Sequence, residues 1–391
     1  MQTLYAFALA PVAEATSDNR SFFSRKGRSQ LDAQAYLRQD LEQPGAPEWI
    51  IIIDIKAYYS RILHQFLLEA IPMDSMILRK FLKAGVIRDG ELFATDQGIS
   101  LGASLSPIFG NMILDGLQSF IYDRLYPNGN VDYQGGCMTR FADDMIILAR
   151  SKGQADLIWQ IISEFLSMRG LEINTEKSKI VNIYDGFDFV SWHFQRKQGY
   201  LTIEPSENSL IQCEHNLEKI IMDTNSSYRT LIRRINGYLS GWANYHRSID
   251  AYHAFRRIDT VVESLLVDKM LLRHPSWHKE TVLNKFWVKD GENHIFILPE
   301  DPSVRVVPLA PLPIRQYKPC KLDFNFYLDK DYYIWLQHRR NIQRVSGKYR
   351  TVWNHQEGKC YFCDSPMLSD QDVEIIEKKI GQGILMDAKS L

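Results

Sequence analysis

The chain has little cysteine and no long apolar run, and each absence excludes a class of protein. Five cysteines in 391 residues, with only Cys360 and Cys363 closely spaced, are too few for a disulfide framework. No apolar stretch approaches the roughly 20 residues of a membrane-spanning helix. The apolar start, residues 1–11, lacks the basic region and cleavage site of a signal peptide. We therefore expect a cytoplasmic protein with no membrane partner.

The chain also lacks the positive charge excess that nucleic-acid-binding proteins usually carry. It has 46 Lys and Arg against 47 Asp and Glu, a formal net charge of −1. The charge is unevenly spread, because eleven basic and only four acidic residues lie between Arg305 and Lys359. This basic tail predicts contact with a polyanion concentrated there. A solvated charged face is the alternative.

Two adjacent acids, Asp143 and Asp144, stand between Arg140-Phe141-Ala142 and the apolar run 145–149. This pattern predicts the tight turn of a β-hairpin whose second strand is the apolar run. A third acid, Asp54, interrupts the apolar run 51–55, which predicts a buried strand. A carboxylate there costs several kcal/mol unless a metal, a hydrogen bond or solvent compensates it.

Three carboxylates form a suitable ligand set for two Mg²⁺ ions about 4 Å apart, which stabilise the attacking and leaving oxygens in phosphoryl transfer. Asp54, Asp143 and Asp144 are therefore candidate metal ligands. The alternative for the adjacent pair is a solvated Asp-Asp turn.

Four segments resemble, in order, the palm motifs of group II intron-encoded (maturase-like) reverse transcriptases. Residues 54–59 (DIKAYY) resemble the first motif and residues 96–107 the second, with Leu101 in place of the usual glutamine. Residues 141–144 (FADD) resemble the third, with Phe in place of the usual Tyr, and residues 170–179 the fourth. The resemblance implies an α+β fold: a reverse-transcriptase palm, with an antiparallel sheet packed on helices, and partial fingers.

Further segments extend the resemblance along the chain. The basic turn Gly27-Arg28-Ser29, with Ser29 as the expected N-cap of a helix, resembles a segment near the template or nucleotide. Residues 186–194 resemble the primer-grip hairpin, and residues 241–247 resemble the thumb or maturase segment. Helices are predicted at 155–171, 210–222, 228–245 and 251–272.

The resemblance implies three parts. Residues 1–200 form the palm and partial fingers, residues 201–290 a helical thumb or maturase domain, and residues 291–391 a basic linker and a degenerate HNH-like tail. The tail has only the Cys360–Cys363 half of a zinc site, so we expect neither zinc nor nuclease activity. Only 53 residues precede Asp54, fewer than in the family. We therefore expect either a separate polypeptide that supplies the missing fingers or a truncated copy.

The resemblance also assigns roles to single residues. Asp54, Asp143, Asp144 and Lys177 are the catalytic set, Lys177 facing the departing pyrophosphate, and Ile55 joins the three acids in the metal site. The nucleotide-binding set is Ile55, Tyr59, Gly102, Phe141 and Arg28. Tyr59 lies under the sugar and selects deoxynucleotides. The nucleic-acid contacts are Arg25, Lys26, Arg233, Arg234, Arg247, Arg339 and Arg340. A core aromatic is the alternative for Tyr59, and a surface turn for Lys177.

The expected function is RNA-directed DNA polymerisation, in which two Mg²⁺ ions assist attack of a DNA primer 3′-hydroxyl on the α-phosphate of a dNTP, with release of pyrophosphate, on an RNA template. The alternative is a catalytically idle maturase-like protein that clamps intron RNA as a splicing cofactor. A cellular role such as phage defence shares the chemistry and stays open.

Overall fold

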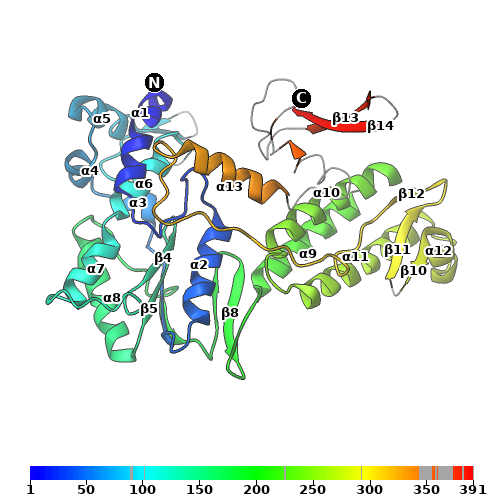
Figure 1. The fold of residues 1–391 in the computed structure, drawn as a ribbon, viewed down its shortest axis with the longest axis horizontal. Coiled ribbons are helices and arrows are strands. Elements are labelled where there is room, and N and C mark those ends of the chain that lie inside the picture. Colours follow the sequence, from blue (N-terminus) through cyan, green and yellow to red (C-terminus); the bar gives the residue numbers. More distant parts are fainter. Residues whose placement is uncertain are drawn as a thin grey trace. The chain divides into compact units, whose positions relative to one another are not determined.

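The computed structural model describes residues 1–88, 91–100, 102–223, 226–291, 293–342, 355–356, 359, 373–380 and 383–390. Leu101, Cys360 and Cys363 lie outside these ranges. The chain folds into two compact units (Figure 1). Unit 1 comprises Met1–Asp185 and Tyr317–Leu391, and unit 2 comprises Gly186–Gln316. Within the described ranges, no helix combines the length and apolar character that crossing a bilayer requires.

The centre of unit 1 is a four-stranded antiparallel sheet in the order β4-β5-β1-β6. Its strands are β4 (Met138–Phe141), β5 (Asp144–Ala149), β1 (Trp49–Ile53) and β6 (Lys179–Asn182). Residues 145–149 of β5 are all buried, as are Ile50, Ile51 and Ile53 of β1. The two apolar runs are therefore the central strands of the sheet, which confirms the buried strands predicted from them.

Helix α8 (Lys152–Ser167) packs across β1, β5 and β6. Its apolar stripe recurs every three or four residues, and Ala155, Ile158 and Ile162 are fully buried. At its start the Ser151 side chain accepts a hydrogen bond from the Gln154 amide, which satisfies one of the free N–H groups of the first turn. The helix predicted from this stripe is confirmed.

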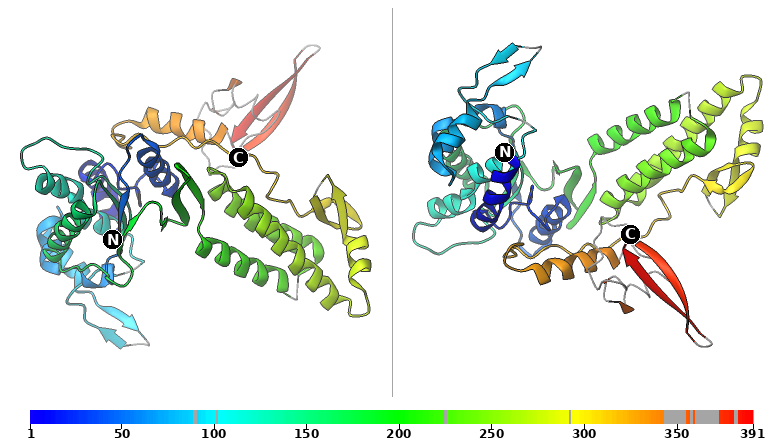
Figure 2. Two further views of the ribbon diagram at one scale, coloured as in Figure 1. Left: turned by 90° about the horizontal axis from the view of Figure 1, so that it is seen from below. Right: turned by 90° about the horizontal axis from the view of Figure 1, so that it is seen from above.

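The first 130 residues form nine further elements besides β1 within the described ranges. They are α1 (Gln2–Thr16), α2 (Gln30–Glu42), α3 (Tyr58–Arg61), α4 (His64–Ala70), α5 (Ser75–Leu82), β2 (Val86–Arg88), β3 (Glu91–Phe93), α6 (Ser106–Leu114) and α7 (Leu117–Leu125). Ser29 precedes α2 as predicted, but its hydroxyl bonds to the Asp32 carboxylate instead of a backbone amide. The β2–β3 hairpin projects away from the rest of unit 1 (Figure 2).

The C-terminal segment returns to unit 1 and packs on the turn before α2. Helix α13 (Lys330–Ile342) contributes Leu336 to a small core with Cys320 and Phe324. Tyr36 of α2 donates a hydrogen bond to the Cys320 carbonyl at 2.7 Å. Farther along the chain, β13 (Val373–Ile380) and β14 (Gly383–Ser390) form an antiparallel hairpin.

Unit 2 begins with the antiparallel sheet of β7 (Phe187–Phe189), β8 (Trp192–Lys197) and β9 (Tyr200–Pro205). Val190 and Ser191, between β7 and β8, both have positive φ (42° and 76°), as a type I′ hairpin turn requires. The segment that resembles the primer grip is thus a hairpin.

Three long helices follow, α9 (Glu207–Met222), α10 (Tyr228–His246) and α11 (Tyr252–Arg273), and they run side by side (Figure 1). All three match predicted helices. The sequence pattern missed the next part, α12 (Lys279–Phe286) and the sheet of β10 (Trp287–Asp290), β11 (Asn293–Leu298) and β12 (Asp301–Arg305). The proline-rich stretch after it is tied to α11, because the Asp259 carboxylate accepts hydrogen bonds from the amides of Leu309 and Ala310.

Candidate active site

Strand register brings Asp54 to the hairpin that carries the other two acids. In the antiparallel pairing of β1 with β5, Ile53 lies opposite Met145. The next residue along β1, Asp54, therefore reaches the sheet end where β5 begins with Asp144. On the other side, Phe141 pairs with Asp144, which leaves Ala142 and Asp143 as a two-residue turn. Ala142 has φ 57°, which the primed hairpin turns require at this position.

The charges of the three acids influence one another. Loss of solvent around the Asp143 carboxyl raises its pKa, and the negative charge of Asp54 raises it further. The pKa of Asp144 rises to about 6 for the same first reason, with further contributions from Asp143 and Asp54, although part of this residue is exposed. Lys177 opposes both shifts. The three carboxyl groups thus lie within electrostatic reach of one another at one end of the sheet.

The fourth motif folds over Asp54. Asn174 donates from its amide nitrogen Nδ2 to Asp54 Oδ1 at 2.9 Å, and the Ser178 hydroxyl accepts from the Asp54 backbone amide at 2.9 Å. Lys177 Nζ lies 3.8 Å from Asp54 Oδ2, and 70% of the Lys177 side chain is exposed. Sequence reasoning named Lys177 but missed Asn174 and Ser178, whose only signal is their place beside Lys177 in the same motif.

The donor set suits a hard cation. Carboxylate oxygens are the ligands that Mg²⁺ prefers, and a divalent cation would offset both the loss of solvent and the mutual repulsion that raise these pKa values. Within the part of the chain that the structure describes, however, no three His, Cys, Asp or Glu side chains are gathered closely enough to hold a metal ion. The residues fit Mg²⁺ by chemistry, and binding requires their side chains to turn toward one another.

Tyr58 and Tyr59, one of which was expected to be a core aromatic, differ in burial and in contacts. Tyr58 is buried, and its hydroxyl donates to the Gly110 carbonyl of α6. Tyr59 is half-buried, with its ring edge-on to Tyr58 at a centroid distance of 4.9 Å. Burial raises the Tyr59 pKa, and the charge of Asp143 adds to this, so Tyr59 lies within electrostatic reach of the hairpin. Tyr58 is therefore a core aromatic, and Tyr59 is the less buried ring of the pair.

The other residues assigned to the nucleotide have different surroundings. Ile55 is buried and pairs with Ile173 in an isolated bridge. Phe141 packs edge-on against Phe23, with ring centroids 5.3 Å apart. Gly102 has φ 85° and is exposed, with open space where a Cβ would lie.

The basic turn before α2 is mostly engaged within the protein. Arg25 is buried, and its Nη2 lies 2.7 Å from the Glu14 carboxylate. Arg28 is buried as well and donates to the carbonyls of Leu322 and Phe324. Lys26 is exposed, with its Nζ 5.0 Å from the centre of the Phe326 ring. In this arrangement, Lys26 alone of the three basic residues presents its side chain to solvent.

The basic residues of α13 and unit 2 that were predicted to contact nucleic acid differ in their exposure and in their partners. Arg340 binds the buried Asp32 carboxylate at 2.6 Å, whereas Arg339 is exposed. In unit 2, Arg234 pairs with Asp223, and Arg247 donates to the Pro313 carbonyl. Arg233 is exposed on α10.

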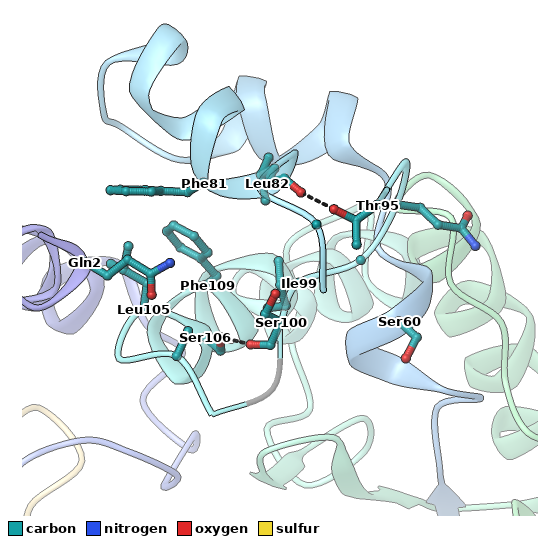
Figure 3. A pocket seen from close by; sticks show the side chains of 14 residues that line it. Gln2, Ser60, Phe81, Leu82, Thr95, Ile99, Ser100, Leu105, Ser106 and Phe109 are labelled. Carbon is teal, nitrogen blue, oxygen red and sulfur yellow. Dashed lines mark hydrogen bonds between the residues drawn. The ribbon is translucent and has the colours of Figure 1, made fainter. Parts of the chain in front are cut away.

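A cavity of about 450 Å³ lies beside the second motif (Figure 3). Phe81 of α5 and Phe109 of α6 contribute aromatic rings to its lining, and Gln2 of α1 contributes an amide. Gln97, from the second motif, also lines it. None of the lining residues is charged, so the cavity does not add to the ligand set of the acids.

Comparison with known proteins identifies the fold around these acids. Residues 1–203, more than half of the chain, match the family model for reverse transcriptase (RNA-dependent DNA polymerase). The chain belongs to this family. Residues 212–287 match the maturase-specific domain of group II introns, so the reverse transcriptase match is followed by a maturase match. The resemblance to group II intron-encoded reverse transcriptases is confirmed, as is the palm fold with its antiparallel sheet and helices.

Curated relatives of this reverse transcriptase are distant. Protein YkfC of Escherichia coli is 25% identical over 236 residues, 51% of this chain and 61% of YkfC. Maturase-like protein 1 of Euglena gracilis is 24% identical, covering 64% of this chain and 52% of the relative. The putative COX1/OXI3 intron 2 protein of Saccharomyces cerevisiae is 22% identical, covering 56% of this chain and 32% of the relative. The matches thus span less than two thirds of each relative.

Solved structures with some likeness include telomerases. Telomerase of Candida albicans, in complex with a fragment of telomeric RNA, gives a TM-score of 0.37 at 14% identity, covering 72% of this chain and 52% of that one. Apo telomerase of Candida tropicalis gives a TM-score of 0.39 at 16% identity, covering 72% and 55%.

Proposed function

We propose that this chain is an RNA-directed DNA polymerase of the group II intron type, which adds dNTPs to the 3′ end of a DNA primer on an RNA template. One observation carries the proposal: the antiparallel register brings Asp54 to the sheet end where Asp143 and Asp144 form the hairpin turn. Membership in the reverse transcriptase family supports it. The cytoplasm, where RNA and dNTPs meet, is the proposed location.

Each residue of the site has a part in the proposed reaction. Asp54, Asp143 and Asp144 would hold two Mg²⁺ ions, with Ile55 beside Asp54 at the same strand end. When bound, Mg²⁺ supplies charge stabilisation at the attacking and leaving oxygens. Lys177, exposed and 3.8 Å from Asp54, would give a proton to the departing pyrophosphate.

Substrate positioning falls to the residues around the hairpin. The half-buried ring of Tyr59 would lie beneath the sugar and exclude a 2′-hydroxyl. Gly102 and Phe141 would face the nucleotide, where the open space at Gly102 permits close backbone approach. Arg28 would reach the nucleotide only after releasing the carbonyls of Leu322 and Phe324.

The maturase-specific match suggests that unit 2 binds intron RNA. Arg233 is exposed on α10, where a guanidinium can contact phosphates, and Arg234 and Arg247 lie on the same helix or just after it. In unit 1, the exposed Lys26 and Arg339 are further proposed contacts with nucleic acid.

The second candidate function is splicing support without polymerisation. Two curated relatives are named maturase-like proteins, and the three acids are not gathered into a ligating set. In that case the chain would bind intron RNA through its maturase-specific region, and the acids would have no catalytic part.

Extension of a labelled DNA primer on an RNA template with Mg²⁺ distinguishes polymerisation from splicing support without polymerisation. The proposal expects extension by the wild type, loss of extension in Asp143→Asn, and wild-type extension in Asp156→Asn, which changes an exposed acid of α8. A folded wild type that binds intron RNA with the same affinity as Asp143→Asn, and never extends a primer, would overturn the proposal and favour the splicing role.

A further inference from the structure

Arg140, the residue before Phe141 in β4, is fully buried, with no exposed side-chain surface. A buried guanidinium is costly unless a charge and hydrogen bonds satisfy it. The groups that bind its two Nη atoms therefore show what this side chain can hold in place so close to the hairpin turn.

The Arg140 guanidinium binds groups on three elements. Its Nη2 lies 2.6 Å from Asp115 Oδ1, between α6 and α7. Its Nη1 donates at 3.4 Å both to Asn111 Oδ1 of α6 and to the Ala142 carbonyl in the hairpin turn. The short contact with Asp115 anchors the side chain. Of the two longer contacts, one reaches α6 and the other reaches the turn, which the planar geometry of the guanidinium permits.

The groups that hold Arg140 are themselves fixed. Asp115 also accepts a hydrogen bond from the Ser17 hydroxyl at 3.0 Å, and Asn111 donates to the Phe23 carbonyl at 2.8 Å. Burial raises the pKa of Asp115 to about 6, while the neighbouring Arg140 opposes that shift. The network therefore connects the helix of the second motif to the carbonyl that directly precedes Asp143.

We propose that Arg140 is a positioning residue for Asp143: anchored by Asp115 and Asn111, it holds the Ala142 carbonyl and thereby fixes the turn that presents Asp143. The inference rests on the proposed function, because it assumes that Asp143 is a metal ligand. Ala142 has φ 57°, a conformation that non-glycine residues adopt only when their surroundings enforce it. The hydrogen bond from Arg140 is one such constraint.

A double variant separates positioning from simple support of the fold. Arg140→Met combined with Asp115→Leu removes both charges and fills their volume, a change that buried ion pairs often tolerate. The matched control is Arg124→Met with Glu164→Leu, an ion pair at 2.8 Å whose side chains are about half exposed. Full-length proteins are compared by thermal unfolding, by titration with Mn²⁺ monitored by electron paramagnetic resonance, and by primer extension.

The inference expects the Arg140/Asp115 variant to stay folded but to bind Mn²⁺ about tenfold more weakly, the size of effect found when support of metal ligands is lost. The control pair should bind Mn²⁺ like the wild type. A folded Arg140/Asp115 variant with wild-type Mn²⁺ affinity overturns the inference. If that variant does not fold, Arg140→Lys takes its place, and wild-type Mn²⁺ affinity in Arg140→Lys overturns the inference equally.

Primer extension distinguishes failure of the inference from failure of the proposed function. A wild type that binds Mn²⁺ but never extends a primer overturns the polymerase function, while the Mn²⁺ comparison still decides the role of Arg140. A wild type that extends primers beside an equally active Arg140/Asp115 variant overturns the inference alone.

Discussion

At the scale of single residues, the cluster of Asp54, Asp143 and Asp144 sets the charge balance of the site. Reduced solvation and mutual repulsion raise the pKa values of Asp143 and Asp144, the latter to about 6. In the folded protein these groups therefore keep their protons to higher pH than in the unfolded chain. Between about pH 4, the unfolded pKa of Asp, and pH 6, ionisation of Asp144 lowers stability as pH rises.

The first prediction follows from this loss of stability as Asp144 ionises. Mg²⁺ binds ionised carboxylates, so its stabilising effect should be small at pH 5 and grow toward pH 7, to about 2–4 °C in thermal midpoint at saturating Mg²⁺. Differential scanning fluorimetry with and without Mg²⁺ measures it. Asp144→Asn should abolish most of this increase with pH. Burial also raises the pKa of Asp115 to about 6, but Asp115 is present in both the wild type and Asp144→Asn and therefore does not contribute to the difference between them. An increase with pH that persists in Asp144→Asn would contradict this.

The second prediction concerns sugar selection by Tyr59. Its ring lies against α6, where a Cβ on Gly110 would come within 3.2 Å of it. Replacing the ring in Tyr59→Ala opens space for a 2′-hydroxyl, and rNTP use relative to dNTP use should rise by about 10–100-fold in kcat/KM. The control is Tyr58→Phe, which keeps the ring and loses only the hydroxyl bonded to Gly110. An unchanged ratio in Tyr59→Ala would assign Tyr59 to the core.

Single residues also show the limit of sequence reasoning. The motifs located Asp54, Asp143 and Asp144, because acids within apolar runs are conspicuous. No pattern shows whether an arginine faces solvent. Arg25 was predicted to contact nucleic acid and Arg28 the nucleotide, but both are buried and engaged by Glu14 and by backbone carbonyls. Their assignment to nucleic acid and nucleotide stays a prediction.

At the scale of elements, hydrophobic periodicity predicted most of the framework. The strands around Asp54 and after Asp144, the helix α8 and the three long helices of unit 2 all lie where the pattern placed them. The pattern missed β10, β11 and β12, whose segments are short and interrupted by polar and turn residues. It also gave no pairing partners, since contacts such as β1 with β5 depend on residues about 100 positions apart.

The third prediction concerns the docking of the C-terminal segment. Asp32 of α2 is fully buried and accepts hydrogen bonds from the Cys320 amide, at 2.6 Å, and the Tyr317 hydroxyl, besides its ion pair with Arg340. Asp32→Ala leaves these donors without their acceptor and should lower the free energy of unfolding by about 3–5 kcal/mol.

Urea unfolding followed by tryptophan fluorescence measures this loss. Asp331→Ala, which removes an exposed acid from the first turn of α13, is the control and should change stability by less than about 0.5 kcal/mol. Equal stability of the two variants would show that the segment docks without help from Asp32.

At the scale of the whole molecule, a net charge of −1 leaves no general attraction to RNA, so affinity has to come from local groups. Unit 2 contains the maturase-specific match and offers the exposed Arg233. The three-part division at residues 200 and 290 stays a prediction. The two compact units include a return of the chain to unit 1, which no linear pattern of the sequence reveals.

The fourth prediction tests this local attraction. Arg233→Gln should weaken binding of intron RNA at every salt concentration and reduce the slope of log affinity against log salt by about 1. Filter binding from low to moderate salt measures the slope. Arg257→Gln is the control, because Glu207 and Glu214 already neutralise Arg257. Equal slopes for the wild type and Arg233→Gln would place the RNA contacts elsewhere.

The central claim is that Asp54 acts with Asp143 as one centre, although 88 residues separate them in the sequence. Single-turnover addition of one dNTP to a DNA primer on an RNA template tests it most directly, using Asp54→Asn, Asp143→Asn and the double variant. Because residues that act as a unit give non-additive losses, all three variants should lose the rate to the same extent. A rate in Asp54→Asn close to that of the wild type, beside a loss in Asp143→Asn, would contradict the claim.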